Sequence, residues 1–278
     1  MQLTLSIAAI VLGSAQLVSA GCSNIKSVMT IVLENTDYSE AIAQSYMGAT
    51  LPPKGYLLTN YFGVSHPSQG NYIAMVAGGV NGCKSDSNCN LGVKSVADLL
   101  EAKGLTWKSY QESYPGNCYT GSRSGTYYRK HNPFMSFTSI SGNATRCARN
   151  VVASQLDKDA ANNALPNYMF YSPDINNDGH DTGAAYADRW LKSFLEPKLT
   201  NPAYKDTLFH VVFDESDTTS PNYIYSILLG QGIAAAGKKD STKYTHYSFL
   251  ATLEGIFDLG NLGQNDATAA KIPLKCVA

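Results

Sequence analysis

Short apolar runs, each about the length of a buried strand, recur along the chain. Residues 28–33 (VMTIVL) and 208–213 (LFHVVF) are almost continuously apolar, as expected of strands buried on both faces. Residues 223–229 (YIYSILL) are also strongly strand-like, and weaker strand patterns occupy residues 56–62, 105–110 and 167–171. We therefore predict one central sheet whose strands come from the whole length of the chain.

Helical periodicity alternates with these runs. Apolar residues recur four positions apart on one face of residues 184–199 and of residues 247–259. Shorter helices are expected at residues 69–77 and 96–102. Strands that alternate with helices predict an α/β fold with a mostly parallel central sheet and helices on both of its faces.

Residues 79–150 are richer in Gly, Ser, Cys and Tyr than the rest of the chain. We interpret them as long inserts around a site, so that residues 21–278 form a single domain. Residues 1–20 combine an apolar run with the small-residue ending Val18-Ser19-Ala20, which is typical of a cleaved secretory signal peptide. The run is too short for a membrane span, so we expect a secreted, extracellular protein without a stable membrane anchor, with the cell wall as a further location.

Six cysteines follow the predicted signal peptide. An even number in a secreted chain predicts three disulfides, chosen from 15 pairings. A short loop closed by Cys83 and Cys89 and a link between Cys22 and Cys276 are two such pairings. Zinc binding is the alternative, although no C-x-x-C pair occurs. A glycosylation sequon begins at Asn143 and predicts an exposed loop if it is used.

Charge and composition narrow the class of protein further. The 278 residues are 44% hydrophobic, and 21 Lys and Arg against 22 Asp and Glu give a formal net charge of −1. An ordinary apolar fraction with a low net charge excludes a disordered chain. Binding to a nucleic acid backbone needs a basic surface, so we expect no nucleic acid partner. The oligomeric state stays open.

Polar residues that can bind a cation or attack phosphorus follow several predicted strands. They are Glu34 and Asn35 after residues 28–33, His66 and Ser68 after residues 56–62, Asp178, His180 and Asp181 after residues 167–171, and Asp214 and Glu215 after residues 208–213, with His246 before the last helix. Ligands of such sheets bind beyond the carboxyl ends of the strands, so these side chains are expected to converge. The oxygen-rich set predicts a metal-dependent hydrolase.

Ser68 stands directly before the predicted helix 69–77 and is a natural N-cap. A helix amino terminus attracts a phosphate group, and a hydroxyl placed there beside a metal is a good nucleophile. We interpret His131 and His210 as structural, because His210 lies inside a predicted strand and His131 lies in an aromatic loop.

Taken together, these segments resemble the phosphoesterase family of secreted acid phosphatases and bacterial-type phospholipases C, within the alkaline phosphatase superfamily. The matching blocks are IVLEN at 31–35, HPSQGNY at 66–72, NDGHD at 177–181, ADRWL at 187–191, FDE at 213–215 and HYS at 246–248. They occur in family order and span most of the chain, which is most similar to the short fungal acid phosphatases.

The resemblance implies a fold, an activity and a role for each residue. Ser68 is implied to be the nucleophile that forms a phosphoserine, with the histidines around the phosphoryl oxygens. The implied residues are Glu34, Asn35, Ser68, Asp214 and Glu215 for a divalent cation, His66, His180 and His246 for the phosphoryl group, and Asp178 and Asp181 for a second cation if one binds. The cation itself stays open among Ca, Mg, Mn and Zn.

Other functions remain to be weighed against a monoester phosphatase. A phospholipase C-type phosphodiesterase shares the same core chemistry and differs in its pocket. An acyl hydrolase is disfavoured because no G-x-S-x-G motif occurs, and a nucleotide-binding protein because Lys239 replaces the Ser or Thr of a P-loop. A catalytically inactive binding protein with a tyrosine-rich surface is the third alternative.

Overall fold

The computed structural model describes residues 21–218 and 220–276. The predicted signal peptide, residues 1–20, lies outside the described residues. Within these two ranges, no helix combines the length and the apolar character that crossing a membrane requires.

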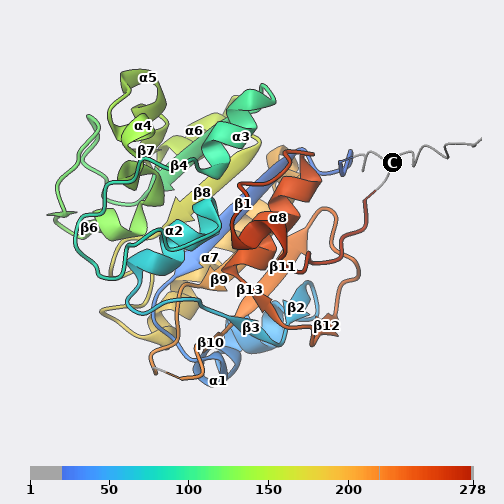
Figure 1. Cartoon of the computed structure of the whole chain (residues 1–278). Coiled ribbons are helices and arrows are strands. Elements are labelled where there is room, and N and C mark those ends of the chain that lie inside the picture. Colours follow the sequence, from blue (N-terminus) through green and yellow to red (C-terminus); the bar gives the residue numbers. More distant parts are fainter. Residues whose placement is uncertain (1–20, 219, 277–278) are drawn as a thin grey trace, which may run out of the picture.

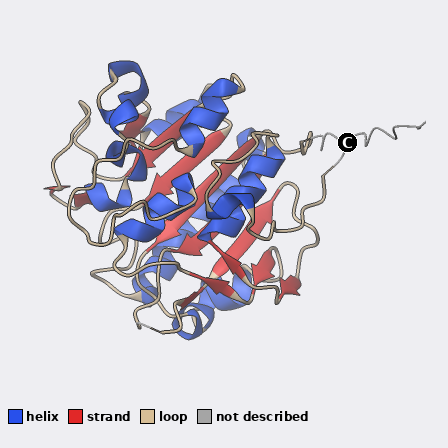
Figure 2. Ribbon diagram, viewed as in Figure 1, coloured by secondary structure: helices blue, strands red, loops and turns tan. Residues whose placement is uncertain are grey.

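A large mixed sheet forms the centre of the fold (Figures 1 and 2). Over the described residues it has eight strands in the order β12-β2-β11-β9-β1-β8-β4-β7. They are β1 (Ser27–Leu33), β2 (Tyr56–Leu58), β4 (Trp107–Gln111), β7 (Asn150–Val152), β8 (Tyr168–Ser172), β9 (Thr207–Phe213), β11 (Ser226–Gly230) and β12 (Lys238–Asp240). β1 runs parallel to β8 and β9, whereas β11 is antiparallel to β2 and β9. The predicted, mostly parallel α/β architecture is confirmed.

Two smaller sheets and two helical layers complete the described fold. β3 (Tyr61–Phe62), β10 (Tyr223–Ile224) and β13 (Tyr244–Thr245) form one small sheet, and β5 (Arg123–Ser124) with β6 (Tyr127–Tyr128) form a hairpin. The helices are α1 (Tyr38–Ile42), α2 (Gln69–Ala77), α3 (Val96–Ala102), α4 (Thr138–Ser141), α5 (Ala144–Cys147), α6 (Gln155–Ala161), α7 (Ala184–Thr200) and α8 (His246–Ile256), with a π-helix η1 (Ser45–Thr50) and 3-10 turns η2 (Arg129–His131), η3 (Pro133–Ser136), η4 (Pro202–Tyr204) and η5 (Asn265–Ala267). In Figure 1, α2, α3 and α8 cover one face of the large sheet, and α7 lies behind the other.

The two central strands form the most deeply buried part of the core. Every residue of β1 and of β9 is buried, which explains why both read as continuous apolar runs. Their register pairs Leu33 with Phe213, the last residue of each strand. The residues that follow, Glu34 and Asp214, therefore leave the sheet side by side.

The structure divides two segments that the sequence predicts as single strands. Residues 56–62 form β2 and β3, and residues 223–229 form β10 and β11. In each segment one piece pairs within the large sheet and the other within the small sheet. The residue between β10 and β11, Tyr225, is fully buried, so the apolar pattern continues through the break and hides it.

All six cysteines are paired in the described part of the chain. The disulfides are Cys22–Cys276, Cys83–Cys89 and Cys118–Cys147, with Cα–Cα distances of 4.6, 5.9 and 5.6 Å. These distances are normal for disulfides. The predicted oxidised framework is confirmed, including both pairings suggested by position, and zinc binding by these thiols is excluded.

One buried carboxylate ties helix α7 to the segment after β1. Asp188 accepts hydrogen bonds from the backbone N–H groups of Tyr46 at 3.1 Å and Met47 at 2.8 Å. It also accepts one from the Ser45 hydroxyl at 3.4 Å. Asp188 thus satisfies amide donors at the start of η1 that have no other partner there.

We expect Asp188→Ala to lower the free energy of unfolding by about 2–4 kcal/mol, because it strands two buried amide donors. Asp188→Asn should recover part of this loss, since its amide oxygen can still accept one of the bonds. Urea denaturation followed by circular dichroism measures both. A loss below about 1 kcal/mol for Asp188→Ala would contradict this role.

Candidate active site

Three acidic residues are positioned by the ends of adjacent parallel strands. Backbone bonds continue the sheet beyond its last residues: Asp214 N–H donates to the Leu33 carbonyl and Glu34 N–H donates to the Asp178 carbonyl, each at 2.9 Å. The side chains of Glu34, Asp178 and Asp214 are 0% exposed. We call these three residues and Glu215, which is also buried, the carboxylate cluster.

Asn35 turns the chain away from β1 and closes one side of the cluster. Its φ of 33° lies in the left-handed region, which asparagine tolerates better than most residues. In this conformation its N–H donates to Asp214 Oδ1 at 3.2 Å. The Glu-Asn pair after β1 thus presents a carboxylate and an amide toward the same point.

Ser68 lies among these groups. Its Oγ is 3.0 Å from Glu34 Oε2, 3.1 Å from Glu215 Oε1 and 3.4 Å from Asn35 Oδ1. The N-cap prediction for its side chain is wrong: Ser68 has helical backbone angles and makes no capping hydrogen bond. The cap is supplied by Asp86, whose Oδ1 accepts from the Gln69 N–H at 3.1 Å. The Ser68 hydroxyl is thereby free to face the carboxylates.

The loop before Ser68 is held by an asparagine one turn into α2. Asn71 Oδ1 accepts from the backbone N–H groups of Val64 and Ser65, and its Nδ2 donates to Ser65 O and to Glu215 Oε2. Gly70 is required by the same packing, because a Cβ at that position would lie 2.4 Å from Ser65 Oγ. The hydroxyl of Ser68 is therefore positioned by a rigid turn.

His131 enters the cluster from η2, inside the predicted insert. It lies between two acids, with Nε2 3.3 Å from Glu34 Oε2 and Nδ1 3.4 Å from Asp178 Oδ2. Its ring stacks on Tyr72, whose hydroxyl donates to Glu34 Oε1. Glu34, His131 and Asp178 have ligand atoms within 4.8 Å of one another, a spacing that suits a metal ion. The sequence-based interpretation of His131 as merely structural did not anticipate this position.

The three histidines predicted around the phosphoryl group take different positions. His66 Nδ1 lies 2.9 Å from Glu215 Oε2, with a third of its side chain exposed. His180 is exposed and its Nδ1 contacts Asp181 Oδ1 at 2.7 Å. His246 is buried, and its Nε2 donates to the backbone carbonyl of Asp214 at 2.6 Å. His66 therefore flanks the cluster at its surface, while His246 supports Asp214 from the interior.

The charges of the cluster are unbalanced. Burial and the charge of Glu34 raise the pKa of Asp178 and Asp214 well above its usual range, and the same two causes raise the pKa of Glu215 to about 7. Burial would also raise the pKa of Glu34, but the charges of His131 and Lys130 outweigh it and lower that pKa. Four carboxyl groups thus compete for very few positive charges, so the protein resists ionising all of them.

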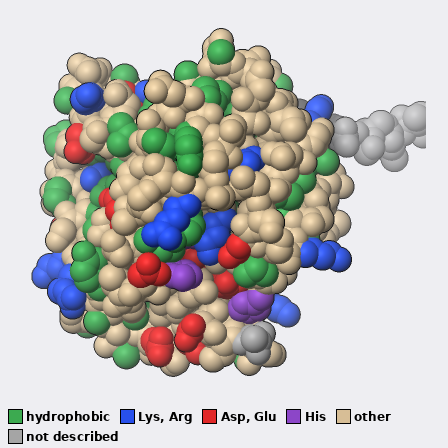
Figure 3. Space-filling model, turned by 90° about the vertical axis from the view of Figure 1, so that its left-hand side faces the viewer, with side chains coloured by type: hydrophobic (Ala, Val, Ile, Leu, Met, Phe, Trp, Pro, Cys, Tyr) green, Lys and Arg blue, Asp and Glu red, His purple; other side chains and the backbone are tan. Residues whose placement is uncertain are grey.

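The residues present fit a divalent cation. Buried polar atoms without a hydrogen bond partner among the described residues include Asp214 Oδ2, Asp178 Oδ2 and His131 Nε2. Carboxylate, amide and hydroxyl oxygens converge with one imidazole, which is a donor set that divalent cations accept. A bound cation would offset the repulsion and occupy the unpaired oxygens. On the face that contains the carboxyl ends of the strands, acidic, basic and histidine side chains gather near the centre (Figure 3).

Comparison with known proteins identifies the family of the chain. The profile of the Phosphoesterase family matches residues 41–260. The chain belongs to the Phosphoesterase family. It is 38% identical to a probable acid phosphatase of Kluyveromyces lactis, over 88% of this chain and 61% of the relative. It is 39% identical to a phosphate-repressible acid phosphatase of Penicillium chrysogenum, over 89% of this chain and 64% of the relative. The chain thus spans about three fifths of the length of these curated relatives.

Solved structures support the same fold for this chain. A protein of the alkaline phosphatase superfamily from Vibrio parahaemolyticus superposes with a TM-score of 0.56 at 12% identity, covering 87% of this chain and 69% of that one. At this identity the likeness concerns the fold alone. The family implied by the sequence blocks is confirmed, and the fold is similar to that of the superfamily member.

The candidate site brings together most of the residues expected from the sequence. Glu34, Asn35, Ser68 and Glu215 lie in direct contact, and Asp214 contacts Asn35. Asp178 joins them through His131, whereas Asp181 is half exposed and pairs with His180. The roles assigned to these residues stay predictions. His131 follows no predicted strand, so the rule that led to the other residues had no means of finding it.

We expect the protein without a bound metal to lose stability as the pH rises, because a raised carboxyl pKa favours the protonated folded state. For Glu215 the stabilisation is present below pH 4.5 and is lost as the pH rises through its folded pKa of about 7. We expect the melting temperature of the wild type, measured in a chelator, to fall by about 5 °C relative to that of Glu215→Gln between pH 4.5 and pH 7.

The lowered pKa of Glu34 acts below this interval and does not oppose the effect. Adding Mn²⁺ at pH 7 should raise the melting temperature of the wild type more than that of Glu215→Gln, which has a neutral amide in place of the carboxylate. If the melting temperatures of the two proteins depended on pH in the same way, the raised pKa of Glu215 would be contradicted.

Proposed function

We propose that this phosphoesterase is a metal-dependent acid phosphatase that hydrolyses phosphate monoesters through a phosphoserine at Ser68. One observation carries the proposal: the Ser68 hydroxyl, beside the amino terminus of α2, lies within 3.1 Å of two buried carboxylates from distant segments. The two relatives compared above are named acid phosphatases, which supports the same class of reaction.

Ser68 is oriented for attack before any substrate binds. Its hydroxyl already points at Glu34 and Glu215, either of which can take the proton as the Oγ–phosphorus bond forms. The bond from phosphorus to the alcohol oxygen breaks in the same displacement. Water then attacks the phosphoserine, which releases inorganic phosphate and returns the proton to Ser68.

Glu34, Asn35, Ser68, Asp214 and Glu215 would hold the cation, and His131 and Asp178 lie where a shared or second cation would be bound. When bound, the cation lowers the pKa of the serine hydroxyl and neutralises charge on the phosphoryl oxygens. His246 fixes the backbone of Asp214 and keeps it in register with Glu34. Burial lowers the pKa of His246 to about 4, so this contact is made by a neutral ring at mildly acidic pH.

His66 is the residue best placed to protonate the leaving alcohol. It shares Glu215 with Ser68, because Ser68 contacts Oε1 and His66 contacts Oε2 of the same carboxylate. Its partial exposure places it at the mouth of the site, where an alcohol would depart. Burial lowers the pKa of His66, so the ring carries the proton that the alkoxide needs only at acidic pH, as an acid phosphatase requires.

Secretion of the enzyme is part of the proposal. Three disulfides suit an oxidising compartment, and residues 1–20 have the pattern of a signal peptide. Asn143, the first residue of the sequon, is exposed, as N-glycosylation would require.

Ser68→Ala should lower the turnover of p-nitrophenyl phosphate at least about 10³-fold, because it removes the nucleophile and leaves the rest of the site. Acid quenching with a ³²P-labelled substrate should trap phosphoserine in the wild type and none in Ser68→Ala. Ser139→Ala, at an exposed serine far along the chain, is the matched control and should retain full turnover.

Turnover of Ser68→Ala within tenfold of the wild type would contradict the nucleophile. Parallel assays with the diesters bis(p-nitrophenyl) phosphate and phosphatidylcholine distinguish a monoester phosphatase from a phosphodiesterase. Faster hydrolysis of these diesters than of the monoester would instead favour a phospholipase C-type enzyme.

A further inference from the structure

A cavity of about 310 Å³ lies beside the nucleophile and has no role in the site described above. It is lined by Asp86, Ser122, Arg123, Tyr128 and Lys130, and we call it the Arg123–Lys130 pocket. Its volume is at the lower end of the range for small-molecule sites, enough for a group the size of a sugar phosphate.

The inner end of the pocket adjoins Ser68. Asp86 accepts from the N–H of Gln69, the residue after the nucleophile, and its other oxygen pairs with Lys130 Nζ at 2.8 Å. Only 11% of the Lys130 side chain is exposed, and its charge acts on Glu34 and Asp214. Lys130 thus stands between the carboxylate cluster and the pocket.

The outer end of the pocket is the hairpin β5–β6. Arg123 and Tyr128 are a cross-strand pair, and the guanidinium of Arg123 lies 4.9 Å from the centre of the Tyr128 ring. Arg123 Nε donates to the Gly125 carbonyl at 2.9 Å. Its two terminal NH₂ groups have no partner among the described residues, so a planar fork of donors is left for an anion.

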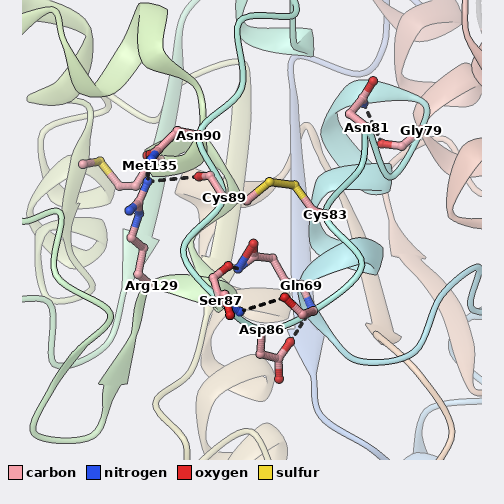
Figure 4. The surroundings of a disulfide bond; sticks show 11 residues. Gln69, Gly79, Asn81, Cys83, Asp86, Ser87, Cys89, Asn90, Arg129 and Met135 are labelled. Carbon is pink, nitrogen blue, oxygen red and sulfur yellow. Dashed lines mark hydrogen bonds between the residues drawn. A yellow bond between two sulfur atoms is a disulfide. The ribbon is translucent and has the colours of Figure 1, made fainter.

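Both walls of the pocket are rigid. One wall is the loop closed by the Cys83–Cys89 disulfide, which carries Asp86 (Figure 4). Arg129, which is buried, joins this loop to the hairpin by donating to the Cys89 carbonyl and to Asn90 Oδ1. The disulfide and Arg129 thus connect the two walls of the pocket, and Asp86 pairs with Lys130 between them.

The charge of the pocket is positive. Asp86 is offset by Lys130, which leaves the charge of Arg123 without an acidic partner in the lining. Arg123 covers one face of Tyr128, so stacking of an aromatic leaving group on that face is blocked. A compact anion suits this lining better than an aromatic or an apolar group does.

We propose that the Arg123–Lys130 pocket binds a second phosphate group on the alcohol part of the substrate, so that the enzyme prefers polyols carrying two phosphate monoesters. This inference rests on the proposed phosphatase function. One phosphate lies at Ser68 while the other reaches the guanidinium of Arg123.

Steady-state kinetics with fructose 1,6-bisphosphate, fructose 6-phosphate and p-nitrophenyl phosphate test the inference. For the wild type, we expect kcat/KM for the bisphosphate to exceed that for the monophosphate about tenfold, the effect of one charge-assisted contact. Arg123→Gln should bring this ratio close to one, mainly through KM. Arg189→Gln is the matched control, because Arg189 lies over Tyr186 at 5.7 Å on α7, outside the pocket, and the ratio should stay at the wild-type value.

The outcomes separate the two proposals. A ratio that Arg123→Gln leaves unchanged, or a wild-type ratio near one, overturns the pocket's role while hydrolysis of p-nitrophenyl phosphate still supports the phosphatase. If Arg189→Gln lowers the ratio as much as Arg123→Gln does, the pocket's role is overturned as well, because the preference would then come from the overall charge of the protein. Failure to hydrolyse any of the three esters overturns the phosphatase proposal and the pocket's role with it.

Discussion

Repulsion between buried carboxylates is the constraint on which the rest of the site depends. Glu34, Asp178, Asp214 and Glu215 are all less than 3% exposed, and few cations face them. Burying unpaired charges is costly, so this arrangement persists only if protons or a cation neutralise it. The fold meets part of the cost through its sheet, whose hydrogen bonds extend into Glu34 and Asp214 and fix the acids in place. The remaining imbalance is what makes the cluster suited to a divalent cation and to the chemistry of phosphate.

The fold separates a rigid sheet edge from the inserts that complete it. β1, β8 and β9 supply the acids, while the segment between β3 and α2 supplies Ser68, held by Asn71. The insert between α2 and β7 contributes His131 and Lys130 at the cluster and Arg123 farther out. Two of the three disulfides lie within this insert, which also contributes β4 to the large sheet. Our proposals thus place the reaction at the edge of the sheet and the choice of alcohol in the insert.

Particular residues show why some of this was predictable from the sequence. Glu34 and Asp214 directly follow the two longest buried strands, so the apolar pattern alone placed them at one edge. Ser68 was found through the start of α2, although its side chain contacts carboxylates instead of capping the helix. His131 was interpreted as structural because the part of the insert after residue 110 has no periodicity from which a position can be inferred. The sequence did not reveal that residues 56–62 and 223–229 each form two strands. Tyr225, between β10 and β11, is buried, and buried residues flank residues 59–60 between β2 and β3, so the apolar pattern shows no clear interruption.

The central claim is that Ser68 and acids from two segments far apart in sequence share one cation. Anomalous diffraction from crystals grown with Mn²⁺ tests it most directly. We expect a peak within about 2.0–2.6 Å of Ser68 Oγ, of a Glu34 oxygen and of an oxygen from Asp214 or Glu215. A peak that lies elsewhere, with no manganese bonded to Ser68 Oγ, would contradict the claim.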